Sequence, residues 1–116
     1  MKIFLLILLL IFFNNCTKKE YGNKIESSRI VQVKNLKLYP LNYLNSIILI
    51  KGKVVEESSK GLWINVNDDG FTISVNFEKS KIKLGNLMSK RVVSAGRFVK
   101  TNDGYIIEGI YLKVLD

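Results

Sequence analysis

The chain contains no histidine and a single cysteine among its 116 residues. Without an imidazole there is no histidine base and no histidine ligand, and a lone thiol cannot supply the several cysteines of a structural zinc site. One cysteine also cannot form a disulfide within a chain, so stability must come from apolar burial and hydrogen-bonded strands. These absences disfavour an enzyme, and we expect no metal and no cofactor.

The remaining polar residues offer only weak catalytic patterns. Adjacent acids occur at 56–57 and 68–69. Neighbours in a strand point to opposite faces, and the second pair precedes a glycine in a turn, whose local chemistry already explains it. Residues 58–60, Ser-Ser-Lys, could supply a Ser-Lys pair but carry no supporting motif. A cryptic hydrolase is therefore only the third of three functional hypotheses.

The N-terminus carries an unbroken apolar run from Ile3 to Phe13 after a single cation at Lys2. This order is typical of a secretory signal. Eleven helical residues would cover roughly 16 Å, about half of the ~30 Å core that a permanent transmembrane helix crosses. A buried core helix is the alternative, but such a helix normally shows polar residues along one side, and this run has none. We predict that residues 1–15 are a cleaved signal peptide.

Cys16 follows where this run ends, in the sequence Phe13-Asn14-Asn15-Cys16. The junction resembles the lipobox of bacterial lipoproteins in a relaxed, spirochaete-like form, with Phe and Asn where the common form has Leu and Gly or Ala. The resemblance implies that the Cys16 thiol carries the acyl anchor, palmitate included, and that the protein is held on a membrane of the cell envelope, at its periplasmic or surface face. The alternative, a buried small side chain, is disfavoured by the polar residues 17–20.

Cleavage before Cys16 would leave enough chain for one domain. Residues 16–28 are polar apart from Tyr21 and Ile25, so we predict a lipidated cysteine followed by a flexible tether. The domain is then expected at 29–116, with its core at about 41–115. Losing the leader removes one of the 18 Lys and Arg and none of the 10 acids, so the mature chain stays strongly basic.

Beyond the tether, β-branched and aromatic residues alternate with polar ones in short runs bounded by Gly, Asn and Asp, a pattern typical of strands and tight turns. Asp-Gly pairs at 69–70 and 103–104 predict two hairpin turns. Gly52 inside the first run predicts a bend. Residues 78–88 predict one or two helical turns, and 29–38 a lead-in strand before a turn at Pro40. The predicted strands cover about 47–56, 62–67, 71–77, 91–99 and 105–115.

Five strands, an irregular or helical insert after the third and a glycine bend in the long first strand resemble an OB-fold over about Leu41 to Val114. Residues 43–54 and 61–64 are similar to the opening of small exported bacterial OB-like domains. The resemblance implies a mainly all-β fold, a five-stranded OB-like barrel with a short helical insert between strands 3 and 4. Another small barrel or a β-sandwich is the alternative.

OB-folds usually bind ligands across strands 2 and 3 and the neighbouring loops, which gives a set of candidate ligand-binding residues. Lysines beside an exposed tryptophan suit a polyanion, either an acidic glycan or single-stranded nucleic acid. The alternative is that the lysines form a solvated strand face and that the tryptophan packs under a loop or helix. The candidates are Lys51, Lys53, Trp63, Asn65, Thr72, Ser74 and Asn76.

The first hypothesis is therefore a non-catalytic interaction module, monomeric or weakly associated, that contacts the membrane through its acyl anchor on Cys16. Its partner would be an envelope protein, bound by strand addition at an open edge, or an anionic ligand on the basic face. A polyanion binder is the second hypothesis. Nucleic acid is disfavoured as a partner because it is scarce in an envelope compartment.

Overall fold

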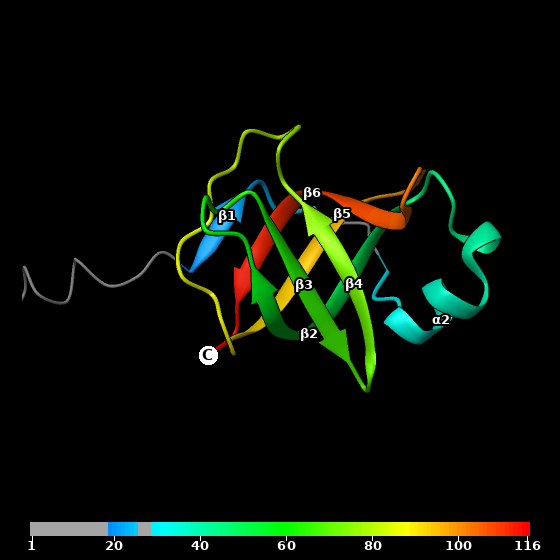
Figure 1. Cartoon of the computed structure of the whole chain (residues 1–116), viewed down its shortest axis with the longest axis horizontal. Coiled ribbons are helices and arrows are strands. Elements are labelled where there is room, and N and C mark those ends of the chain that lie inside the picture. The colour runs from blue at the N-terminus through cyan, green and yellow to red at the C-terminus, as the bar shows by residue number, and fades with distance from the viewer. Residues whose placement is uncertain (1–18, 26–28) are drawn as a thin grey trace, which may run out of the picture.

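The computed structural model describes residues 19–25 and 29–116 (Figure 1). The predicted leader 1–15, Cys16 and residues 26–28 of the predicted tether lie outside these described residues. No helix in the described stretches is long and apolar enough to span a membrane. Their elements, in chain order, are β1 (Glu20–Gly22), α2 (Val33–Leu38), the 3-10 helix η1 (Pro40–Asn42), β2 (Ile47–Glu57), β3 (Trp63–Asp68), β4 (Phe71–Asn76), β5 (Arg91–Thr101) and β6 (Gly104–Val114).

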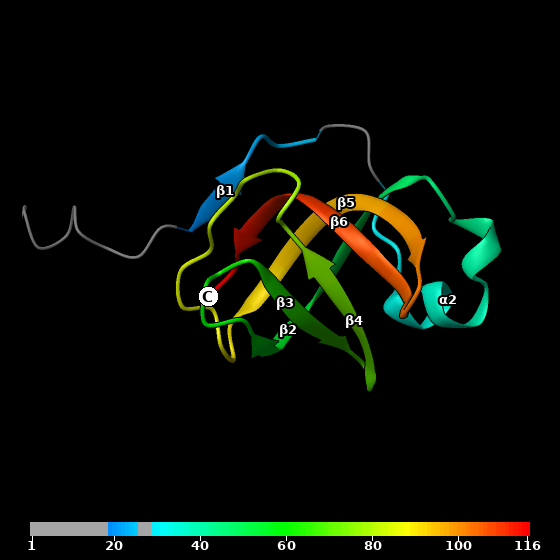
Figure 2. The same ribbon diagram turned by 45° about the horizontal axis from the view of Figure 1, so that its top comes forward.

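Strands β2 to β6 close into a barrel (Figure 2). The pairings β2–β3, β3–β4, β2–β5 and β5–β6 are antiparallel. A short parallel pairing of β4 with β6, at Val75↔Ile107 and Asn76↔Glu108, completes the ring. The order around the ring is β2-β3-β4-β6-β5, which confirms the predicted five-stranded OB-like barrel.

The barrel is filled by the inward half of each alternating strand. In β4 the residues Ile73 and Val75 are buried, and Phe77 follows them into the core, while the residues between them are half-exposed. The same alternation buries Ile64 and Val66 of β3. Burying a large aliphatic or aromatic side chain stabilises the fold by about 1.5–3 kcal/mol, so the pattern that predicts the strands also supplies their stability.

The long strand β2 pairs with two other strands and changes partner at Lys53, next to Gly52. It pairs with β5 from Ile47 to Lys53 and with β3 from Lys53 to Glu57. A Cβ atom at Gly52 would lie 2.5 Å from the backbone oxygen of Asn67, closer than real side chains approach. Only a residue without a side chain therefore fits at this position. The irregularity in the β2–β3 pairing lies further along, between Val54 and Glu56, so the bend at Gly52 itself stays a prediction.

Replacing Gly52 by Ala should therefore lower the free energy of unfolding by about 2 kcal/mol, because the added methyl group must push β2 and β3 apart. Chemical denaturation followed by circular dichroism measures this change. Gly70→Asn is the matched control: Gly70 has a φ of 88° and nothing within 4 Å of its virtual Cβ, and Asn tolerates positive φ. Equal stability of Gly52→Ala and the wild type would contradict the steric requirement for glycine at this position.

The helical form of the predicted insert at 78–88 is wrong, and the insert is irregular. This segment forms turns and extended chain, and Lys81 and Ser89 take positive φ values of 58° and 65° that end any helical run. It still covers one end of the barrel, because Leu84 and Leu87 are buried. The backbone N–H of Leu87 donates to the Glu57 carboxylate at 2.8 Å, which fastens the segment to β2.

The predicted lead-in strand at 29–38 is also wrong, since Val33–Leu38 form α2. Val33 and Leu36 are buried at helical spacing, and a run this short cannot be assigned to strand or helix from its periodicity alone. The Asp68 carboxylate accepts a hydrogen bond from the Val33 N–H at 3.2 Å and so caps the start of the helix from β3. Only Ile30 keeps strand character, through a parallel bridge to Leu49.

The predicted tether is wrong for Glu20–Gly22, which form β1 and pair antiparallel with residues 111–113 of β6. Tyr21 is buried, and its hydroxyl accepts a hydrogen bond from the Gly85 N–H at 3.0 Å. Backbone pairing and one buried aromatic ring together offset the entropy of ordering this stretch. Because β1 covers β6 here, this edge is already occupied by the chain itself and is not open to strand addition.

Candidate binding faces on the barrel exterior

The seven predicted ligand-binding residues all lie on the barrel exterior, but they divide between two hollows. Trp63, Asn65, Thr72, Ser74 and Asn76 line a hollow of about 540 Å³ over β3 and β4. Its other walls come from the β5–β6 hairpin and from α2, through Thr101, Asp103, Tyr105, Ile106 and Lys37. We call this hollow the polar face.

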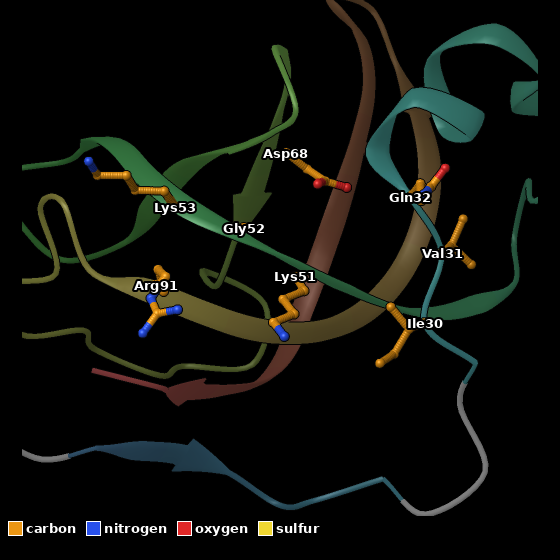
Figure 3. A pocket seen from close by; sticks show the side chains of 8 residues that line it. All are labelled: Ile30, Val31, Gln32, Lys51, Gly52, Lys53, Asp68 and Arg91. Carbon is orange, nitrogen blue, oxygen red and sulfur yellow. The ribbon is translucent and has the colours of Figure 1, made fainter.

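The two lysines line a second hollow of about 390 Å³ on the β2 and β5 side of the barrel. We call it the basic groove. Figure 3 shows Lys51 and Lys53 leaving β2 and Arg91 leaving β5, while the Asp68 carboxylate points toward the start of α2. The lining residues are Ile30, Val31, Gln32, Lys51, Gly52, Lys53, Asp68 and Arg91.

The lysines and the tryptophan are separated because they lie at opposite ends of the β2–β3 pairing. Lys53 is opposite Asn67 near the end of β3, whereas Trp63 is its first residue. Four residues of strand correspond to about 13 Å. The predicted single surface that combines lysines with Trp63 is therefore not formed.

The polar side chains of the polar face are arranged as cross-strand pairs. Asn65 is opposite Ser74, and the Ser74 hydroxyl donates to the Asn65 Oδ1 atom. Asn67, at the margin of the face, donates through Nδ2 to the Thr72 hydroxyl at 3.0 Å. These bonds fix the amides and hydroxyls before any ligand arrives, which reduces the ordering cost of binding.

Two aromatic side chains border these polar pairs. Trp63 is half-buried and lies opposite Asn76 in the pairing of β3 with β4. Tyr105 stacks on the buried Phe98 with ring centroids 5.3 Å apart and an interplanar angle of 14°. Since Phe98 is part of the core, Tyr105 is held in a fixed position against the core where it lines the face.

The two hollows differ in charge. The polar face has one cation, Lys37, and one carboxylate, Asp103, so its lining charges balance. The basic groove has three cations against the single carboxylate of Asp68. A polyanion therefore finds little attraction on the polar face, although OB-folds use this surface for ligands.

Arg91 is tied to the C-terminal residue of the chain. Its Nε atom donates to Asp116 Oδ1 at 2.8 Å, and its backbone N–H donates to Oδ2 at 2.9 Å. These two hydrogen bonds lower the pKa of the Asp116 carboxyl, with a smaller electrostatic contribution from Arg91 and Lys90. The pair is largely exposed, so it orients the Arg91 side chain more than it stabilises the fold.

The residues considered for catalysis have structural roles. The Ser58 hydroxyl accepts hydrogen bonds from the N–H groups of Leu62 and Trp63, at 2.8 and 3.3 Å, and so closes the turn between β2 and β3. Asp69 takes a positive φ of 52° in the hairpin turn. Among the residues that the structure describes, no three His, Cys, Asp or Glu side chains are grouped to hold a metal ion.

The sequence matches no protein-family model and no curated protein sequence. Among solved structures, the hypothetical protein ygiW from E. coli, which has an OB-fold, superposes with a TM-score of 0.59 at 16% identity, covering 81% of this chain and 98% of that one. A putative aspartyl-tRNA synthetase from Leishmania major Friedlin gives a TM-score of 0.61 at 12% identity, covering 93% of this chain. The match spans only 25% of the synthetase chain. At these identities the likeness shows the fold alone, an OB-like barrel.

Proposed function

We propose that this protein is a lipid-anchored, non-catalytic binding module that holds an uncharged, hydroxyl-rich chain, an oligosaccharide, on its polar face. The observation that carries the proposal is the composition of that face: amides and hydroxyls in fixed cross-strand pairs share the hollow with two aromatic residues, one positive charge and one negative charge. Acyl attachment at Cys16 behind a cleaved leader supplies the anchor.

Each part of the face matches a property of sugars. Sugar hydroxyls need donors and acceptors at fixed positions, which Asn65, Thr72 and Ser74 provide. Sugar rings also have apolar C–H surfaces that pack on aromatic side chains, and convergent polar groups fix the orientation of a bound ligand. OB-folds bind oligosaccharides on this surface, which makes the fold compatible with the role.

The polyanion hypothesis receives less support on this face. Single-stranded nucleic acid and acidic glycans need several cations along the bound chain. Lys37 is the one cation among the lining residues, and Asp103 balances it. Lys51 and Lys53 belong to the other hollow.

Trp63 is the only tryptophan of the chain, so its fluorescence reports binding at this face directly. Titration with neutral oligosaccharides of glucose and of N-acetylglucosamine should give a saturable change that is insensitive to salt. Asn65→Ala should weaken the affinity about fivefold, because it removes a hydrogen-bonding amide worth ~1 kcal/mol and leaves Ser74 without this partner.

Asn86→Ala is the matched control, since Asn86 is an exposed amide in the 78–90 segment, outside the polar face. It should bind as the wild type does. If no oligosaccharide of the panel changes the fluorescence, or if the affinity falls steeply with salt, the proposed ligand class is wrong.

A further inference from the structure

We propose that the outer surface of β2, β5 and β6 around Lys51, Lys53, Arg91 and Lys113 rests on an anionic phospholipid bilayer. We call this surface the basic face. The polar face would then point away from the membrane, toward its ligand. The inference rests on the lipid anchor of the proposed function and adds an orientation and a lipid class to it.

Strand register brings the four cations together. Lys51 is opposite Val93, and Val93 is opposite Lys113, so these side chains form one outward row across three strands. Lys53 is opposite Arg91 in the adjacent outward row. All four basic side chains are exposed. Neighbouring strands lie ~4.8 Å apart and alternate residues of a strand ~7 Å apart, so the backbone positions of the four residues lie within a patch about 10 Å across.

The carboxylates on this surface are bonded within the protein, while further cations flank it. Lys19 and Lys90 are exposed and lie next to the start of β1 and the start of β5. Basic residues thus outnumber acids here, in contrast to the polar face. The three acids are Asp116, bonded to Arg91; Asp68, bonded to the backbone of Val33; and Glu20, bonded to Tyr111.

Exposed aliphatic side chains accompany these cations. Ile30 lines the basic groove and is 64% exposed. Leu115 is 38% exposed, and its backbone N–H donates to the backbone oxygen of Arg91 at 2.8 Å. Cations beside exposed aliphatic groups are typical of surfaces that lie at the boundary between headgroups and acyl chains. A soluble polyanion would use the cations but not the aliphatic groups.

The point where the chain leaves the barrel toward Cys16 adjoins the same surface. The Val114 N–H donates to the backbone oxygen of Lys19 at 2.7 Å, which places Lys19 beside Val114 and next to the paired residues Glu20 and Lys113. Two residues lie between Cys16 and Lys19, so the three steps from one to the other span at most ~11 Å. Because residues 20–22 of β1 are paired with β6, they add no length to this connection. An acyl group on Cys16 therefore holds the basic face within reach of the headgroups.

The same geometry directs the polar face outward. In the closed ring β5 is a neighbour of β2 and β6 only, so β3 and β4 lie across the barrel from it, as Figure 1 shows. The hairpin tip at Thr101–Gly104, which borders the polar face, is nine residues along β6 from Lys113. This corresponds to about 30 Å of strand. The chain exit at β1 and the hairpin-tip side of the polar face thus lie far apart, whereas Lys53 adjoins the polar face through its cross-strand partner Asn67.

Lysine footprinting tests the orientation on the native protein, reconstituted in vesicles of phosphatidylcholine alone or of equal parts phosphatidylcholine and phosphatidylglycerol. An amine-reactive, membrane-impermeant reagent modifies exposed lysines, and mass spectrometry reads each site. We expect Lys51, Lys53 and Lys113 to be protected about fivefold or more in the anionic vesicles, given the attraction of each basic residue to such a surface. High salt should remove this protection, and Lys37 and Lys100 should react equally in both vesicles.

Charge variants sharpen the test. The pair Lys51→Glu and Lys53→Glu should abolish the protection of Lys113 in anionic vesicles. The matched pair Lys37→Glu and Lys100→Glu, with the same charge change outside the basic face, should leave it intact. Asp116→Asn, which removes a carboxylate from the face, should increase it.

Acylation is read in the same samples, which separates the two proposals. Acylated protein whose lysines react equally in both vesicles overturns the orientation and leaves the anchor standing. Unacylated protein overturns the anchor. In that case, salt-dependent protection of the basic-face lysines on anionic vesicles supports the orientation through charge alone, and equal reaction in both vesicles overturns it. Equal protection by soluble heparin, without vesicles and at the same ionic strength, would assign the face to soluble polyanions and overturn the lipid assignment.

Discussion

Cys16→Ala should reduce incorporation of radiolabelled palmitate to background, because the chain contains no other cysteine that could carry an acyl group. Acyl chains contribute about 0.8 kcal/mol of membrane affinity per buried CH₂, so their loss is the largest single change in membrane binding that one substitution can cause here. Electrophoresis of labelled cells, followed by autoradiography of the immunoprecipitated protein, measures the incorporation.

Thr17→Ala is the control for this substitution, since it changes the adjacent polar residue and keeps the thiol. It should incorporate label as the wild type does. Equal labelling of the wild type and Cys16→Ala would show that the anchor site is assigned wrongly. A native protein that still begins at Met1, with an unmodified sulfur, would remove the basis for the envelope location.

The barrel strands could be predicted because their signals are local. The run Phe71–Asn76 alternates strictly, and Asp69-Gly70 before it sets a tight hairpin turn, so β4 differs from the predicted 71–77 by one residue. The close approach of β3 to β2 at Gly52 also has a local signal, the glycine itself. Pairing of these strands then follows from turn chemistry and from the need to bury one face of each.

The elements that were predicted wrongly depend on contacts distant in sequence. The strand β1 forms because residues 20–22 pair with the edge of β6, some ninety residues later in the chain. No local sequence pattern predicts that this edge is available for pairing. The start of α2 is capped by Asp68, a residue that the sequence places in a different hairpin. In both cases tertiary structure overrides weak local propensity.

The candidate site divides in the same way. Five of its residues stay together because the β3–β4 hairpin fixes their register. The two lysines lie apart from them, because β2 pairs with β5 as far as Lys53 and with β3 only from Lys53 onward. Tyr105 and Lys37 were missed, and they reach the polar face from the last hairpin and from α2. A signal for Tyr105 existed, since it directly follows the second Asp-Gly turn and the loops of an OB-fold border its ligand surface.

Trp63→Ala should weaken oligosaccharide binding about thirtyfold, or ~2 kcal/mol, because an aromatic side chain that packs against a ligand is the usual dominant contact of such a face. Isothermal titration calorimetry measures this without the tryptophan signal. Trp63→Phe should recover most of the affinity, since a phenyl ring keeps a flat apolar surface for the sugar ring.

Tyr39→Ala is the matched control, as Tyr39 is an aromatic residue that is 58% exposed and does not line the polar face. It should bind as the wild type does. Because Trp63 is half-buried, thermal unfolding of each variant shows whether the barrel is intact at the temperature of the titration. A folded Trp63→Ala protein with wild-type affinity would mean that the ligand does not pack on Trp63. The polar face would then lose its assigned role.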